Sequence, residues 1–142
     1  MTDVPAKYRD LPRWPFGDNP KLADELLALV LMGRKTATCC ALSQYQDEAW
    51  PMPKPGGCWI VLEGAQRPRC VVETTGIEVK PFDQVDASFA YDEGEGDQSY
   101  AYWRQAHESY FSGQGRFAPD MLVVCERFRL LEVLTPVTEA AQ

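Results

Sequence analysis

Apolar residues recur at helical spacing in the first quarter of the chain. Asn19 followed by Pro20 is the usual pairing of a capping side chain with a proline at the first helical position. Beyond them the apolar positions return every three or four residues, at Leu22, Leu26, Leu29 and Val30, with Leu27 and Leu31 widening the face. Gly33 then follows as a natural helix-ending residue. The pattern predicts a helix over residues 20–32 that buries Leu22, Leu26, Leu29 and Val30.

Later segments have the pattern of β-strands. Residues 58–62 are continuously apolar, whereas residues 69–79 and 121–133 alternate apolar and polar side chains as half-buried strands do. In the last run the apolar positions are Leu122, Val124, Phe128 and Leu130. We therefore expect at least three strands in the second half of the chain.

A second helix and one long loop complete the pattern. Trp103, Ala106, His107 and Tyr110 repeat at helical spacing within residues 98–111, with Asp97 or Ser99 as the N-cap. Prolines and glycines make residues 43–57 a predicted loop. The order helix, strands, helix, strand predicts an α+β or small-barrel domain and argues against alternating βαβ units.

Charge and cysteine content limit the possible functions. The net charge is −7, and residues 72–142 carry five basic against thirteen acidic side chains. A long basic track for polyphosphate is therefore excluded, whereas a small nucleic-acid ligand in a pocket is compatible with this distribution. There is neither a signal peptide nor a run of about 18 apolar residues, and the five cysteines have no paired spacing. We expect five reduced thiols in a cytoplasmic protein without membrane contact.

Residues 33–38 read Gly-Arg-Lys-Thr-Ala-Thr and join the end of the first helix to the next predicted strand. One lysine and two hydroxyl groups within four residues can place a base or a cation beside a nucleophile. A helix end with a solvated lysine is the structural alternative. Spacing alone leaves both interpretations open.

Residues 92–97 hold four carboxylates: Asp92, Glu93, Glu95 and Asp97. Such a cluster can bind a divalent cation, or it can raise the pKa of one carboxyl because like charges crowd each other. An acidic loop that caps the next helix is the structural alternative. Two further residues can flank a pocket: Trp14, and Arg104, which lies near the acidic segment in sequence.

Together these segments resemble the ASCH family. The resemblance lies in Phe16-Gly17-Asp18, residues 33–38, Gly56-Gly57-Cys58-Trp59, Pro81-Phe82, Phe89-Ala90, residues 93–97, Trp103 to His107 and Glu126-Arg127-Phe128. It covers about residues 14–133, so 1–13 and 134–142 are expected to be terminal extensions of one domain, 1–142. The chain is similar to the longer bacterial branch of the family. It departs at Gly56-Gly57, where relatives often have Gly-Asp, so one polar contact in this loop is expected to be absent.

The resemblance implies a fold similar to the PUA domain, a small β-barrel of five to six strands with two main flanking helices. Some ASCH proteins are amidohydrolases that remove the acetyl group from N4-acetylcytidine without a metal. Their lysine, threonine and glutamate correspond to Lys35, Thr38 and Glu93, which we predict to be catalytic. Arg34, Thr36, Trp14, Glu95 and Arg104 are the predicted substrate-binding residues. The expected ligand is a nucleoside or RNA, with no obligate protein partner and a monomer or weak dimer.

Two other functions are open. Some relatives are described as metal-dependent ribonucleases, for which Asp92, Glu93, Glu95 and Asp97 would hold the divalent cation. A non-catalytic RNA-binding or regulatory module is the third possibility.

The predicted amidohydrolase chemistry depends on two protonation states. Lys35 is a base only if burial lowers its pKa toward neutrality; otherwise its charge stabilises an oxyanion. We expect Glu93, crowded by neighbouring carboxylates, to be protonated and to donate to the leaving nitrogen.

Overall fold

The fold is built on one five-stranded sheet. The computed structural model of the chain describes residues 4–134. Its strands are β1 (Arg13–Pro15), β2 (Ala37–Ala41), β3 (Cys58–Leu62), β4 (Pro68–Pro81) and β5 (Leu122–Val133). They lie in the order β1-β3-β4-β5-β2, with β1 parallel to β3 and every other pair antiparallel.

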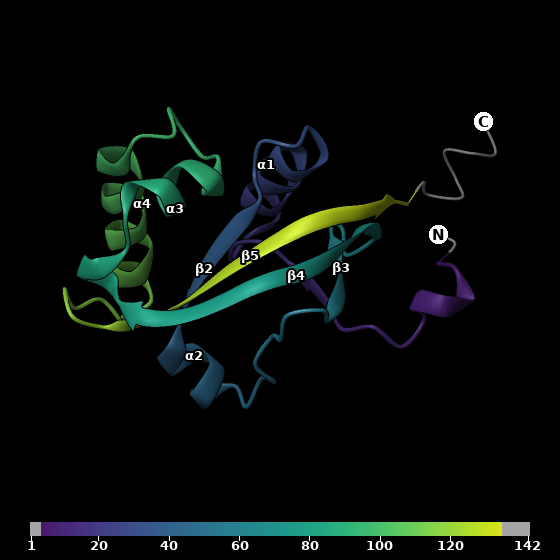
Figure 1. The fold of residues 1–142 in the computed structure, drawn as a ribbon, viewed down its shortest axis with the longest axis horizontal. Helices are drawn as coiled ribbons and strands as arrows, with labels where there is room; N and C mark the ends of the chain where they lie inside the picture. The colour runs from purple at the N-terminus through teal and green to yellow at the C-terminus, as the bar shows by residue number, and fades with distance from the viewer. Residues whose placement is uncertain (1–3, 135–142) are drawn as a thin grey trace.

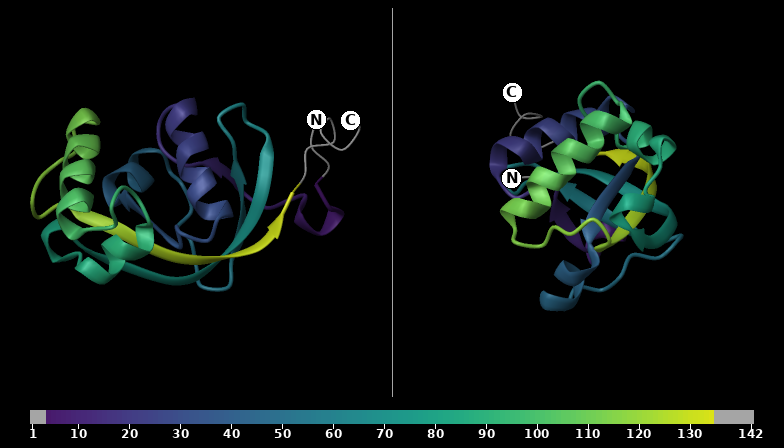
Figure 2. Two further views of the ribbon diagram at one scale, coloured as in Figure 1. Left: turned by 90° about the horizontal axis from the view of Figure 1, so that it is seen from above. Right: turned by 90° about the vertical axis from the view of Figure 1, so that its left-hand side faces the viewer.

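The sheet curls into a half-barrel. The two long strands β4 and β5 run side by side as a curved band (Figure 1), and the register of this pair shifts between Val71 and Val72 and again between Thr74 and Gly76. Such irregularities bend and twist a strand pair. Figure 2 shows two helices, α1 (Pro20–Leu31) and α4 (Tyr100–Gly113), on the concave side of this band.

Four shorter helical segments lie among these elements. They are the 3-10 turns η1 (Ala6–Tyr8) and η2 (Phe82–Gln84) and the helices α2 (Leu42–Asp47) and α3 (Ala87–Glu93). The predicted α+β class is confirmed, with five strands and with α1 and α4 as the two main helices. Of the predicted terminal extensions, residues 1–3 and 135–142 lie outside the described residues.

The face of α1 differs from the predicted one. Asn19 caps the helix as expected, because its side chain accepts a hydrogen bond from the backbone N–H of Leu22 at 2.9 Å. The fully buried residues of α1 are Ala23, Leu27 and Val30. Of the predicted face, only Val30 is fully buried, while Leu22, Leu26 and Leu29 are half-buried. The helix is rotated so that Leu22 and Leu26 line a cavity.

Two short helices were not predicted. The loop expected over residues 43–57 is wrong at its start, where α2 follows β2 directly. Helix α3 begins after Asp86, whose side chain accepts a hydrogen bond from the backbone N–H of Phe89 at 2.9 Å, and it ends at Glu93. Both helices are six or seven residues long, too short for an apolar period to be visible in the sequence.

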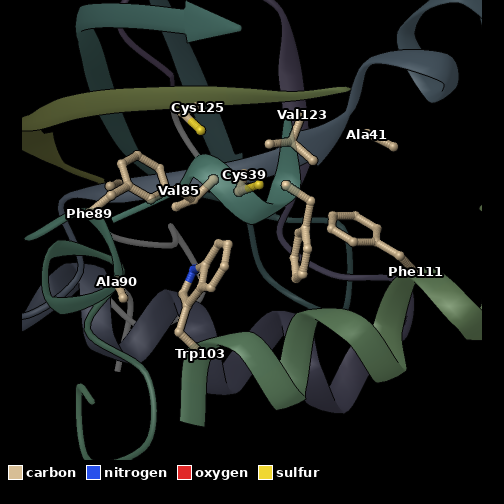
Figure 3. Close-up of a cluster of buried hydrophobic side chains, with 11 residues drawn as sticks. Cys39, Ala41, Val85, Phe89, Ala90, Trp103, Phe111, Val123 and Cys125 are labelled. Atoms are coloured by element: carbon tan, nitrogen blue, oxygen red, sulfur yellow. The ribbon is translucent and has the colours of Figure 1, made fainter. Parts of the chain in front are cut away.

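The largest core cluster joins α4 to the sheet. Trp103 and Phe111 project from α4 toward Cys39, Val123 and Cys125 of β2 and β5 (Figure 3), and all five are buried. Ser99, one of the two predicted caps, accepts a hydrogen bond from the backbone N–H of Tyr102 and fixes the start of α4. The core therefore holds this helix firmly against the sheet.

All five cysteines are free thiols, as predicted. Among residues 4–134, none of the helices has the length and apolar character that crossing a membrane requires.

Candidate functional site

The end of α1 directs Lys35 into the molecule. Gly33 has a φ of +82°, the left-handed conformation that favours glycine, and the backbone N–H groups of Arg34 and Lys35 both donate to the carbonyl of Leu29. The chain thereby turns sharply from the helix into β2. Lys35 is left as a buried residue with 1% exposure.

Helix α3 ends against this turn. Gly94 caps the helix with a φ of +72°, and a Cβ at this position would lie 2.4 Å from the carbonyl oxygen of Arg34. The Arg34 side chain donates to the carbonyls of Gly94, at 2.8 Å, and Gly96. The backbone N–H of Thr36 donates to the carbonyl of Asp92 at 2.8 Å. Arg34 and Thr36, predicted to bind substrate, instead hold two distant segments together.

This contact places Lys35 between two carboxylates. Its Nζ lies 3.0 Å from Oε1 of Glu93 and 2.8 Å from Oε2 of Glu95, with the Glu93 carbonyl oxygen at 3.4 Å. The side chains of Lys35 and Glu93 are each 1% exposed. The three ammonium protons therefore have three acceptors. Lys35 and Glu93, both predicted to be catalytic, form a buried ion pair.

Helix α4 binds the other oxygen of Glu93. Trp103 donates from Nε1 to Oε2 at 2.7 Å, and Nε2 of His107 lies 3.3 Å from the same oxygen. Nδ1 of His107 lies 2.9 Å from the carbonyl oxygen of Trp103. Both ring nitrogens thus face acceptors, an arrangement that only the doubly protonated imidazolium satisfies.

These contacts set the protonation states. Burial lowers the pKa of Lys35 and of His107, but the carboxylates beside them raise both values above the ordinary ones. Burial alone would raise the pKa of Glu93, yet Lys35 and His107, with the Trp103 hydrogen bond, hold it well below its usual range. Lys35 is therefore a cation and not a base. The expectation that Glu93 is protonated is wrong, because its charge is balanced by two cations.

A cavity of about 550 Å³ opens beside this cluster, between α1, α4 and the sheet. Its polar wall includes Thr38, Glu93, Glu95 and His107. Lys35 is not part of the lining, since it lies behind the two carboxylates that it binds. The predicted trio therefore converges, with Thr38 and Glu93 facing the cavity and Lys35 one layer deeper.

Aromatic side chains form a large part of the remaining wall. They are Trp14, Phe16, Tyr45, Trp50, Trp59, Tyr102 and Tyr110. The ring centroids of Trp14 and Trp50 are 5.1 Å apart, and those of Tyr45 and Trp50 are 5.7 Å apart. Trp14 thus lies at the cavity, where it was predicted to bind substrate. Arg104 does not, because its guanidinium packs over the ring of Phe82 at 5.4 Å.

The four carboxylates predicted for a metal do not converge. Asp92 forms an ion pair with Arg127, and Asp97 accepts from the backbone N–H of Ser99 at 2.9 Å. Glu93 and Glu95 are the two that meet. With His107 they place possible ligand atoms within 4.8 Å of one another.

Several residues of the cavity wall were missed from the sequence, among them His107, which was named only for its helical spacing. Tyr45 and Trp50 fall in the segment read as a loop, where no pattern marks them. Glu126 lies on β5 and also lines the cavity. Glu126 does carry a signal in the sequence. It is an acidic residue on the same face of the predicted strand as the apolar Val124 and Phe128.

Comparisons with known proteins agree with this architecture. A family model described as the ASCH domain matches residues 12–132. The crystal structure of protein EF3133 from Enterococcus faecalis, of family DUF984, is 37% identical, with a TM-score of 0.76 over 86% of this chain and 77% of that chain. An ASCH domain from Lactobacillus crispatus is 33% identical, with a TM-score of 0.80 over 89% of this chain and 82% of its own.

A more distant likeness concerns the fold alone. The hypothetical protein PH0355 is 17% identical, with a TM-score of 0.55 over 76% of this chain and 93% of that chain. No curated protein matches the sequence. The family match over most of the chain and the two similar structures lead to one conclusion: the chain belongs to the ASCH domain family.

Proposed function

We propose that the protein is a hydrolase that removes the acyl group from N4-acetylcytidine, as the free nucleoside or as a product of RNA. The observation that carries the proposal is the buried ion pair of Lys35 and Glu93 at the wall of a cavity that Thr38 also lines. Charged groups held without water are suited to act on a bound polar substrate. A cavity of about 550 Å³ lies within the usual range for small-molecule sites.

The aromatic wall supports a planar base as the ligand. Trp50 packs against both Trp14 and Tyr45 at one side of the cavity. Bases stack on aromatic side chains with a gain of about 1–3 kcal/mol per base. The acylated exocyclic nitrogen would then point toward the polar wall.

Thr38, Glu93, His107 and, behind the wall, Lys35 each have a role in this proposal. Thr38 attacks the acyl carbon or orients the attacking water. Glu93, being ionised, accepts a hydrogen bond from the N–H at N4. Lys35 lies directly behind Glu93, and His107 lies beside it. Their positive charges hold the Glu93 carboxylate in place and stabilise negative charge that develops on the acyl oxygen.

A metal-dependent ribonuclease is the second candidate. The ligand atoms of Glu93, Glu95 and His107 within 4.8 Å of one another favour it. A divalent cation there would have to displace the ammonium of Lys35 from both carboxylates. It would also have to displace the proton from Nε2 of His107. Metal binding would therefore compete with two cations already in place. We therefore rank this function second.

Incubation of the purified protein with N4-acetylcytidine tests the proposal, with cytidine and acetate measured by chromatography. We expect turnover that a chelator leaves unchanged, and a loss of about 10²-fold or more in Glu93→Gln. Glu78→Gln is the matched control, because Glu78 is exposed, pairs with Lys80 and does not line the cavity. A wild-type protein that ignores the nucleoside but cleaves RNA with added Mn²⁺ would establish the nuclease instead. Binding of RNA without any turnover would indicate a non-catalytic module.

A further inference from the structure

The proposed hydrolysis needs a proton at the leaving nitrogen, and Glu93 does not supply it. Glu93 is ionised, and both its oxygens already accept hydrogen bonds. Lys35 has an acceptor for each of its protons and lies behind the cavity wall. Among the described residues, Glu126 is a further carboxyl group in the cavity lining.

The sheet places Glu126 next to Thr38. The two are directly opposite each other in the antiparallel pairing of β2 with β5. Directly opposite residues project from the same face of a sheet, with Cβ atoms about 4.5–5.5 Å apart. Both side chains line the cavity. A water or substrate atom in contact with Thr38 is therefore within reach of Glu126.

The hydrogen bonds of Glu126 leave one oxygen for a ligand. Its Oε2 accepts from Nε1 of Trp59 at 3.0 Å and from Oγ1 of Thr74 at 2.7 Å. No hydrogen bond from another described residue goes to Oε1. The carboxyl group is thus held in one orientation by β3 and β4, with its second oxygen unused by the protein.

The surroundings of Glu126 differ from those of Glu93. Glu126 interacts electrostatically with the titratable side chains of Cys40 on β2 and Tyr45 on α2, and both are neutral. Burial and the charges of Glu93 and Glu126 raise the pKa of Cys40 to about 12, and burial raises that of Tyr45 well above its ordinary value. Burial raises the pKa of Glu126 more than the Thr74 and Trp59 hydrogen bonds lower it. The cavity wall thus holds one carboxyl group with a lowered pKa, Glu93, and one with a raised pKa, Glu126. Such a pair is typical of sites in which the two carboxyl groups have different acid–base roles.

We propose that Glu126 is the acid–base residue of this site, taking a proton from the attacking oxygen and giving it to N4 of the cytosine. This inference rests on the function proposed above. Ionised Glu126 accepts the proton as the oxygen of water, or of Thr38, bonds to the acyl carbon. The bond between the acyl carbon and N4 then breaks, and the same proton moves to N4. With water as the nucleophile the products are cytidine and acetate. With Thr38 as the nucleophile they are cytidine and an acetylated Thr38, which one water then hydrolyses to acetate and free Thr38 by the same route.

Glu126→Gln tests the assignment, because the amide keeps the size of the side chain and an oxygen that accepts from Trp59 and Thr74. We expect kcat on N4-acetylcytidine to fall by about 10²–10⁴-fold with KM nearly unchanged. In the wild type, kcat/KM should fall on the acidic side at a pH above the ordinary carboxyl value of 4.5, and the residual activity of the variant should lack this limb. Glu132→Gln on the same strand is the control, since Glu132 does not line the cavity.

The outcomes separate this inference from the function on which it rests. If Glu126→Gln keeps wild-type kcat, or loses activity but retains the acidic limb, Glu126 is not the acid–base residue and the hydrolase proposal stands. If the wild type releases no cytidine, the proposed function fails and the assignment of Glu126 fails with it. Melting curves for both variants show whether either loss reflects unfolding.

Discussion

The ammonium nitrogen of Lys35 lies 3.0 Å from Oε1 of Glu93, and each side chain is only 1% exposed. The two residues are 58 positions apart in the sequence: Lys35 lies in the turn between α1 and β2, and Glu93 is the last residue of α3. Backbone hydrogen bonds between the turn after α1 and the end of α3 bring them together. The pair is therefore part of the folded core as well as of the candidate site.

Removing Lys35 should destabilise the protein. In Lys35→Ala the carboxylates of Glu93 and Glu95 lose their shared cation, and breaking a buried pair from one side costs about 3–5 kcal/mol. Urea unfolding measures this difference. Lys80→Ala is the control, because Glu78, the partner of Lys80, is 67% exposed, and surface pairs contribute about 1 kcal/mol or less. Equal losses in the two variants would contradict a buried ion pair.

The stability of the protein should depend on the charge of His107. Its pKa in the folded protein is raised above 6.5, so the protonated ring stabilises the fold. This stabilisation is fully present below the pKa of the unfolded chain, and it is lost as the pH rises through the raised folded value. We expect the free energy of unfolding to decrease over that window. His107→Phe keeps an aromatic ring against Trp103 and should remove the slope, since His107 is the only histidine. An unchanged slope in the variant would mean that His107 is neutral.

Leu27 and Leu26 should respond differently to truncation. Leu27 is 3% exposed inside the core cluster of α1, so Leu27→Ala should cost about 2–5 kcal/mol. Leu26 is half-buried at the cavity, where truncation removes fewer contacts, and a smaller loss is expected. Chemical denaturation of both variants gives the comparison. A larger loss of unfolding free energy in Leu26→Ala than in Leu27→Ala would instead support the buried helix face predicted from the sequence.

The hydroxyl of Thr38 should matter for activity and little for the fold. Thr38→Val keeps the branched shape on β2 and should reduce turnover of N4-acetylcytidine by about 10²-fold, with a nearly unchanged melting temperature. Thr38→Ser keeps the hydroxyl and should retain most of the turnover. If the valine variant is as active as the serine variant, Thr38 neither attacks nor orients water.

Patterns within single elements were predictable from the sequence. The helix beginning at Pro20, the strands at Cys58 and Leu122 and the helix after Ser99 all match their periodicities. Periodicity can be recognised within one short segment, because each helix or strand places apolar residues on the one face that meets the core. Helices α2 and α3 were missed because six or seven residues hold too little of a period.

Part of the candidate site was also named from the sequence. The segments at 33–38 and 92–97 have a composition and order that resemble one family, and this resemblance pointed to Lys35, Thr38 and Glu93. It did not give their states of charge. Crowding in the sequence suggested a protonated Glu93, whereas Asp92 turns away to Arg127 and Glu95 shares Lys35.

Only the tertiary structure decided which charges meet and which groups face the cavity. A pKa depends on neighbours in space and on burial, and neither follows from sequence distance. Glu126 and Thr38 are 88 positions apart, yet the register of β2 with β5 sets them directly opposite each other. The sequence alone thus determined the elements and the candidate chemical groups, while strand register and burial decided how those groups can act together.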